Sequence, residues 1–243
     1  MKKLEVSGGM STKDSVAFFI KGNKKGIKAT RLEDGTIATE EIELNVQMKS
    51  IFALFKVIFG GFIFRVIFYS CLGLENWMYH IPTIAYGFLF GMAILAISEN
   101  KEIRMHHGAE HKVANWCTHN NLSTYNAYNL TVENVRNSVR IHKGCGTNLL
   151  ATYFTFYLIS SISISCFGVH IPELITALAP LFLYGVFPFN IIGLAAQFIT
   201  TAEPQEEHME VAIAAMMKNV ENEKIKEKQK EMALKVFLDM FKI

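Results

Sequence analysis

Long apolar stretches alternate with polar segments over most of this 243-residue chain. The stretches cover residues 51–74, 78–98, 149–169 and 171–200. The second and third contain no charged residue, and about 20 helical residues at 1.5 Å each cross the ~30 Å hydrocarbon core of a bilayer. We therefore predict about four membrane-spanning helices. Because Arg65 interrupts the first stretch, a tilted helix at the membrane interface is the alternative there.

The two ends of the chain have other periodicities. Residues 28–44 read as two strands around Asp34-Gly35, a dipeptide that suits the positive φ angles of a tight hairpin turn. From Glu206 onward the pattern is that of a charged helix with an apolar stripe within residues 232–241. We predict a small β element at the N-terminus and a helical tail whose end packs on the domain. A surface anchor or a partner helix is the alternative for the stripe.

Composition agrees with membrane segments and excludes several other classes of protein. Hydrophobic residues make up 51% of the chain and charged residues 19%, and the mean hydropathy is +0.23. Disordered, collagen-like and disulfide-rich proteins have different compositions. The net charge of +2 gives no general basic field, so no nucleic-acid partner is expected.

The distribution of Lys and Arg predicts an orientation for the spans. Residues 1–50 contain nine of them, residues 99–148 contain six and residues 201–243 contain seven, whereas the short connections on the other side contain none. The positive-inside rule places all three basic segments in the cytoplasm. The predicted location is the bacterial cytoplasmic (inner) membrane, crossed several times, with both termini in the cytoplasm.

The predicted fold class is mainly α, namely a polytopic α-helical membrane protein with a small cytoplasmic β element. We expect residues 1–48 to form the β-hairpin element and residues 49–200 to form the transmembrane domain. Residues 99–148 are expected to be a cytoplasmic helical loop of that domain, and residues 201–243 a cytoplasmic helical tail.

The central loop carries the sequence His-Gly-Ala-Glu-His at residues 107–111. His107 and His111 are four apart, so on a helix both imidazoles project from one face and can hold a single ion. This is the H-x-x-E-H spacing of inverted zincins, in which two histidines bind zinc and the glutamate is the general base. The motif predicts a divalent metal, with zinc favoured, and Glu110 as the base. His106 and Glu110 are also four apart and form an alternative ligand pair.

Two histidines need a further protein ligand. His142 and Cys145 close the same polar segment and are expected at the same membrane face as the histidine pair. Inverted zincins take their third ligand from a downstream glutamate. Glu203 and Glu210 are therefore alternatives to His142 and Cys145.

Two interpretations of these residues involve no catalysis. In the first, the two histidines only form hydrogen bonds on a polar helix. In the second, Cys117, His119, His142 and Cys145 form a closed structural zinc site, which would remove His142 and Cys145 from catalysis.

Several sequence blocks together resemble the YqhQ family, bacterial multi-span membrane proteins catalogued as predicted metal-dependent enzymes. The blocks are His107–Lys112, Leu130–Arg136, Arg140 with His142, Cys145–Thr147, Thr200–Thr201, Glu203–Pro204 and Glu210–Ile213. The resemblance implies four candidate ligands, which are His107, His111, His142 and Cys145. It also implies Glu110 as the base, with Glu203 or Glu210 as alternative ligands. The family usually opens with a longer glycine-containing block around paired methionines, whereas this chain has only Gly8-Gly9-Met10.

Together these features predict a membrane-embedded, zinc-dependent hydrolase that acts at the cytoplasmic membrane interface, with a peptide bond as the first candidate substrate. Its expected partners are the lipid bilayer and a membrane protein that serves as partner or substrate. The alternative is a non-catalytic scaffold or chaperone of the translocation or envelope machinery, in which the metal is structural. A transporter or channel is a third hypothesis, based on polar residues and prolines in the apolar stretches.

Overall fold

The computed structural model describes residues 3–43, 99–167 and 191–240, with isolated positions between 175 and 186. These residues belong to two compact units. The first unit consists of Met1–Ile42, Glu102–Arg140 and Glu203–Ile243, and the second consists of Glu43–Lys101 and Ile141–Ala202.

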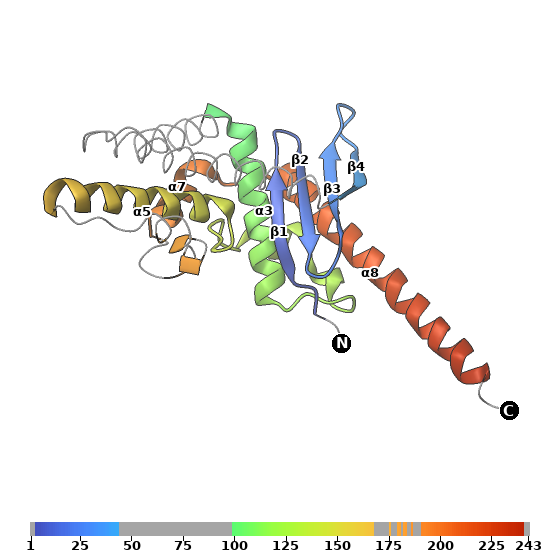
Figure 1. The fold of residues 1–243 in the computed structure, drawn as a ribbon. Coiled ribbons are helices and arrows are strands. Elements are labelled where there is room, and N and C mark those ends of the chain that lie inside the picture. The colour runs from blue at the N-terminus through green and yellow to red at the C-terminus, as the bar shows by residue number, and fades with distance from the viewer. Residues whose placement is uncertain are drawn as a thin grey trace. The chain divides into compact units, whose positions relative to one another are not determined.

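A four-stranded sheet begins the first unit, with its strands adjacent in chain order (Figure 1). The strands are β1 (Val6–Ser11), β2 (Ser15–Ile20), β3 (Lys25–Arg31) and β4 (Ile37–Glu43). Both β1 and β3 pair with β2 in the antiparallel direction. The hairpin predicted around Asp34-Gly35 is confirmed as the connection from β3 to β4, where Gly35 has a φ of +84°. The sheet is larger than the predicted hairpin because β1 and β2 also belong to it.

The hydrophobic core of the first unit lies between the sheet and two helices, α3 (Lys101–His119) and α8 (Glu206–Met240). All six residues of β2 are buried, which fits a strand that is covered on both faces. Val16, Phe18 and Ile20 alternate along β2 and share one core with side chains of α3 and α8. This packing fixes the face that α3 turns toward the sheet.

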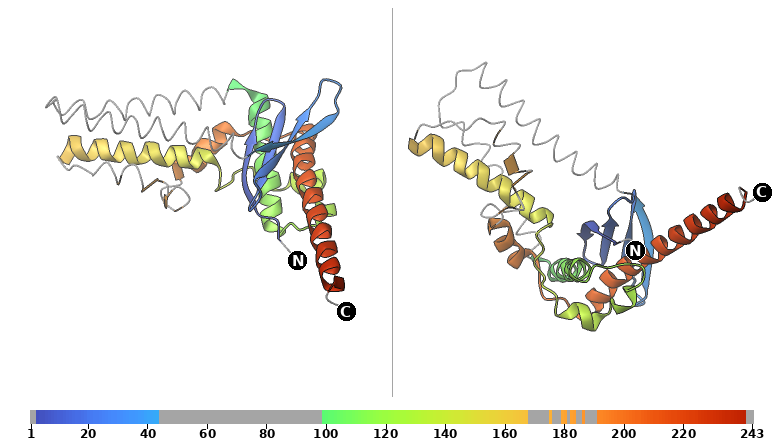
Figure 2. Two further views of the ribbon diagram at one scale, coloured as in Figure 1. Left: turned by 45° about the vertical axis from the view of Figure 1, so that its right-hand side comes forward. Right: turned by 90° about the horizontal axis from the view of Figure 1, so that it is seen from below.

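The helix predicted from Glu206 onward is confirmed as α8. Buried side chains recur at helical spacing in its N-terminal part, whereas its C-terminal part extends past the sheet (Figure 2). Met232, Val236 and Phe237 are 52–60% exposed, so the prediction that this end packs on the domain is wrong. The helix is longer than the sheet that it packs on, and the apolar stripe lies beyond the core. The partner-helix alternative stays a prediction.

The segment after α3 turns back and packs alongside that helix. It contains the 3-10 turn η2 (Ala127–Asn129) and the helix α4 (Val132–Arg136). The Thr131 side chain caps α4 by accepting a hydrogen bond from the Asn134 N–H. Val135 enters the core, which holds the chain after α4 beside α3.

The second unit contains the contacting helices α5 (Gly146–Phe167) and α7 (Ile191–Thr200). Gly193 allows a close approach, since a Cβ at this position would lie 2.6 Å from the Asn148 Cα. The buried Gln197 amide donates to the Asn148 Oδ1 (2.8 Å) and to the His142 carbonyl (3.1 Å). Its oxygen accepts from the His142 N–H at 2.8 Å. These bonds fix the backbone that leads into α5.

The described helices do not support the predicted membrane topology. Within residues 3–43, 99–167 and 191–240, no helix is both long and apolar enough to cross a membrane. The predictions of a polytopic four-span fold, and of a multi-pass inner-membrane location with cytoplasmic termini, are therefore wrong. The predicted spans at 51–74 and 78–98 lie outside the described residues.

The error has a physical cause in each apolar stretch that the structure describes. In the last stretch, the described helix is α7, whose 10 residues span about 15 Å, whereas a hydrocarbon core is ~30 Å thick. In the third, α5 has hydroxyl side chains among its apolar residues, such as Thr152 and Thr155. An apolar stretch in the sequence therefore does not by itself establish a membrane-spanning helix.

Candidate metal centre

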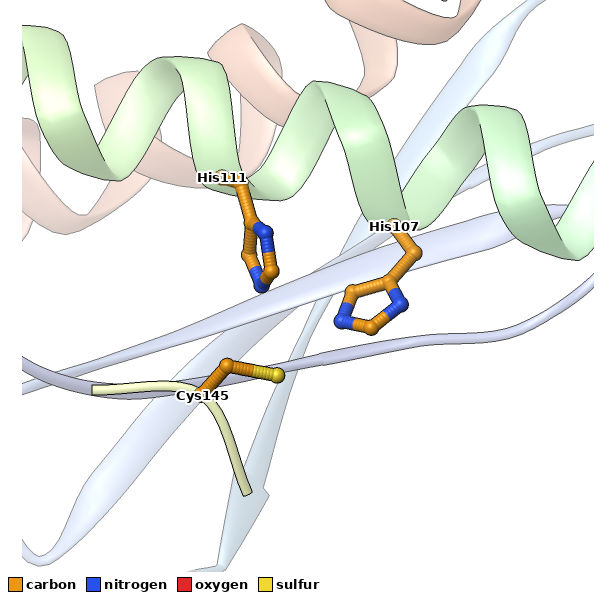
Figure 3. Close-up of side chains that lie close together, drawn as sticks. All are labelled: His107, His111 and Cys145. Carbon is orange, nitrogen blue, oxygen red and sulfur yellow. The ribbon is translucent and has the colours of Figure 1, made fainter. Parts of the chain in front are cut away.

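The central chemical motif lies on α3, and the predicted helix is confirmed there. His107 and His111 project from the same side of this helix, one turn apart (Figure 3). Their ring centroids are 4.4 Å apart and the ring planes meet at 65°. Two imidazoles at this separation can bind one ion between them.

The ring of His111 is held in one orientation by the chain that follows α4. Its Nδ1 lies 2.7 Å from the backbone carbonyl of Arg140, and the side chain is 1% exposed. A carbonyl oxygen only accepts hydrogen bonds, so Nδ1 carries the proton and Nε2 presents its lone pair. Metal-binding histidines are commonly oriented by such a bond on the other ring nitrogen. His111 is thus in the tautomer that binds a metal through Nε2.

Glu110 lies against the first strand of the sheet. Its buried carboxyl group is adjacent to Gly9 of β1 and interacts with the Ser11 hydroxyl. Burial raises the pKa of Glu110 to about 8, and the Ser11 hydrogen bond partly offsets this rise. The carboxyl group does not belong to a metal-binding group formed by the described side chains. The predicted role as a metal-site base stays a prediction, since this carboxyl faces the sheet.

Replacing Gly9 is expected to displace the Glu110 carboxyl. A Cβ at residue 9 would lie 2.7 Å from the Glu110 carboxyl carbon, whereas one at Gly8 would meet nothing within 4 Å. We expect Gly9→Ala to lower the free energy of unfolding by about 1–3 kcal/mol, as overpacking of a core does. Gly8→Ala is the matched control in the same strand. Equal unfolding midpoints in urea for the two variants would contradict this contact.

The alternative ligands Glu203 and Glu210 both bind cationic side chains of the first unit. Glu203 pairs with the buried Lys112 ammonium group at 2.6 Å, and that group also donates to the Arg136 carbonyl. Glu210 pairs with Arg31 at 2.7 Å. The structure therefore gives each carboxylate a cationic partner.

The closed zinc site that would include Cys117 and His119 is not supported by their positions. Cys117 is fully buried in the hydrophobic core, and burial raises the pKa of its thiol to about 12. His119 is exposed at the end of α3. A thiol that stays protonated in an apolar core is a poor zinc ligand, because zinc binds the thiolate.

His142 and Cys145 belong to the second unit and come two and five residues after Arg140. Burial lowers the pKa of His142, which favours the neutral imidazole. The Cys145 N–H donates to the His142 carbonyl at 3.2 Å, so the two residues form a tight turn before α5. The Cys145 sulfur accepts a hydrogen bond from the Thr147 N–H at 3.4 Å.

A second group of side chains was not predicted from the sequence. Glu102 and His106 lie one turn apart on α3 and meet His208, which lies in the first turn of α8. Burial lowers the pKa of His106. The four-residue spacing of Glu102 and His106 is a weak signal for such a group, and nothing in the sequence indicated that α8 would bring His208 to them.

These features define a class of protein. It is a mixed α and β protein in which histidine, cysteine and glutamate side chains form groups that could hold a metal ion. The predicted metal is supported to this extent, whereas its identity stays a prediction.

Comparison with known proteins assigns the family. The chain belongs to the family described as "Protein of unknown function (DUF1385)", which matches residues 1–187. It is 31% identical over 135 residues to the "Uncharacterized protein YqhQ" of Bacillus subtilis (strain 168). This match covers 46% of the chain and 39% of that relative, so the chain spans about two fifths of the relative's length. The resemblance to the YqhQ family is confirmed. No solved structure matches the chain.

Proposed function

We propose that this protein is a metal-dependent hydrolase whose divalent cation, with zinc favoured, is bound by His107, His111 and Cys145. The main support is the hydrogen bond from the His111 Nδ1 to the Arg140 carbonyl. This bond orients the ring and leaves Nε2 for a metal.

Chain connectivity supports Cys145 as the third ligand. Cys145, also labelled in Figure 3, follows Arg140 by five residues, a span of at most about 18 Å when extended. The turn closed by the Cys145 N–H and the His142 carbonyl shortens this span. Two imidazole nitrogens and one thiolate suit zinc, whereas magnesium and calcium prefer oxygen ligands. Three protein ligands leave the fourth position that catalytic zinc sites keep open.

Glu110 is the proposed acid–base residue. When bound, the cation would act as a Lewis acid and activate a water molecule at neutral pH. A carboxyl group with a pKa near 8 is suited to proton transfer at that pH. Glu110 is adjacent to His111 in the chain, and its carboxyl, which lies against β1, would have to turn toward the bound cation to act. A carbonyl centre, with a peptide bond tested first, is the proposed substrate class.

Replacing Cys145 tests the ligand set directly. In the cobalt(II)-substituted full-length protein, a thiolate ligand gives an intense charge-transfer absorption. We expect Cys145→Ser to abolish this band and Cys166→Ser, which changes an exposed thiol of α5, to keep it. A band that survives in the first variant would exclude Cys145 as a ligand.

Glu110→Gln tests whether the metal is catalytic. We expect this variant to keep its metal content and to lose about 100-fold or more in the rate of cleavage of a fluorogenic casein substrate, as loss of a general base does.

Addition of azide should change the cobalt(II) spectrum of the wild type, since an open coordination position on the metal would accept azide as a ligand. A spectrum that azide does not change, with equal cleavage rates for both proteins, would favour the structural metal of a scaffold.

A further inference from the structure

The second group of metal-binding side chains lies entirely within the first unit. Glu102 and His106 belong to α3, and His208 belongs to the first turn of α8. The His208 Nε2 lies 3.0 Å from the Glu102 Oε2, and the rings of His106 and His208 meet edge-on with centroids 4.6 Å apart. One candidate ligand atom from each residue lies within 4.8 Å of the other two.

Burial of its two histidines sets this group apart from a chance cluster on the surface, whereas the Glu102 side chain is 45% exposed. His106 is 5% exposed and His208 is 1% exposed. The His106 Nδ1 lies 3.1 Å from the Glu102 carbonyl, so Nδ1 carries the proton and Nε2 presents a lone pair. The ring of His106 is therefore oriented by a backbone acceptor, in the same way as that of His111.

The second ring of the group has an unsatisfied nitrogen. The His208 Nδ1 is buried and has no hydrogen-bond partner among the described residues. Its nearest ionic neighbour is the Glu207 carboxylate, at 3.9 Å. A buried polar atom without a partner costs about 1–3 kcal/mol. A cation on Nε2 would move the ring proton to Nδ1, where it would interact favourably with the nearby Glu207 carboxylate.

We infer that Glu102, His106 and His208 form a second divalent-cation site, separate from the one proposed at His107 and His111. Two imidazoles and one carboxylate suit a borderline transition-metal ion such as zinc or cobalt(II), and solvent completes the coordination. The site lacks a thiolate, so its spectrum differs from that of a site that includes Cys145. A cation there joins α3 to the first turn of α8. This inference does not depend on the hydrolase proposal.

Cobalt(II) titration of the full-length apoprotein tests the second site. We expect two ions per chain, of which only one gives the thiolate charge-transfer band. Glu102→Gln keeps the shape of the side chain but removes its charge. In this variant, the ion at the second site, which gives no thiolate band, should bind at least about tenfold more weakly. The thiolate band of the other ion should be unchanged. Glu133→Gln, which changes an exposed carboxylate of α4, is the control and should bind both ions as the wild type does.

His208→Gln provides an independent variant, with its fold checked by circular dichroism in EDTA. It should bind one ion fewer than the wild type and keep the thiolate band. Unchanged stoichiometry and affinity in the folded Glu102→Gln or His208→Gln protein would overturn the second site. The double variant His107→Ala/His111→Ala should show the opposite pattern, with loss of the thiolate band alone. The two sites can therefore fail separately.

Discussion

Raising the pH of the metal-free protein from about 5 to about 8 is expected to lower its free energy of unfolding through Glu110. In the unfolded chain this carboxyl group ionises near its ordinary pKa of 4.5, whereas in the folded chain it keeps its proton until about pH 8. Between these values the folded state binds more protons than the unfolded state, so a rise in pH favours unfolding. Each pH unit in this window is worth about 1.4 kcal/mol, which gives a total of up to about 4 kcal/mol.

Urea unfolding at several pH values measures this effect, with Glu110→Gln as the control. The amide does not titrate, so the stability of this variant should lack the Glu110 contribution. His106 and His142 act in the opposite sense below pH 6.5, because burial lowers the pKa of each. Both histidines are present in both proteins, so the difference between the two curves reports on Glu110. Parallel curves from pH 5 to pH 8 would contradict the burial of this carboxyl group.

Removing the histidine pair is expected to abolish the stabilisation that zinc gives through the proposed site. A ligand that binds only the folded state at 1,000 times its Kd stabilises that state by about 4 kcal/mol. We expect His107→Ala/His111→Ala to lose this gain and one zinc ion per chain. The experiment is done in a His208→Gln background, so that the second proposed site does not contribute.

Thermal unfolding with and without zinc, together with metal analysis, measures this loss. His119→Ala is the matched control, because it removes an exposed histidine from the end of the same helix. This control should respond to zinc as the parent does. If the double variant gained as much thermal stability from zinc as the His119→Ala protein, the metal would have to bind elsewhere.

Local patterns predicted the parts of the fold that depend on nearby residues. The spacing of His107 and His111 placed both rings on one side of a helix, because helical periodicity depends only on the local backbone. The turn at Asp34-Gly35 and the helix from Glu206 followed from similar short-range signals.

The surroundings of these elements depend on distant parts of the chain, and the sequence did not reveal them. Glu110 was expected beside the histidine pair, but Gly9 leaves room for its carboxyl against β1. His208 contacts Glu102 although the two residues are 106 positions apart in the sequence, and no local pattern encodes such a contact. The membrane spans were overestimated for a related reason, since an apolar stretch does not fix how much of it forms one continuous helix.

Anomalous X-ray diffraction at the zinc absorption edge, from crystals of the zinc-loaded full-length protein, tests the central proposal most directly. The proposal predicts an anomalous peak about 2.0–2.1 Å from a ring nitrogen of both His107 and His111 and about 2.3 Å from the Cys145 sulfur. Zinc-loaded crystals with no peak within bonding distance of both rings would contradict it.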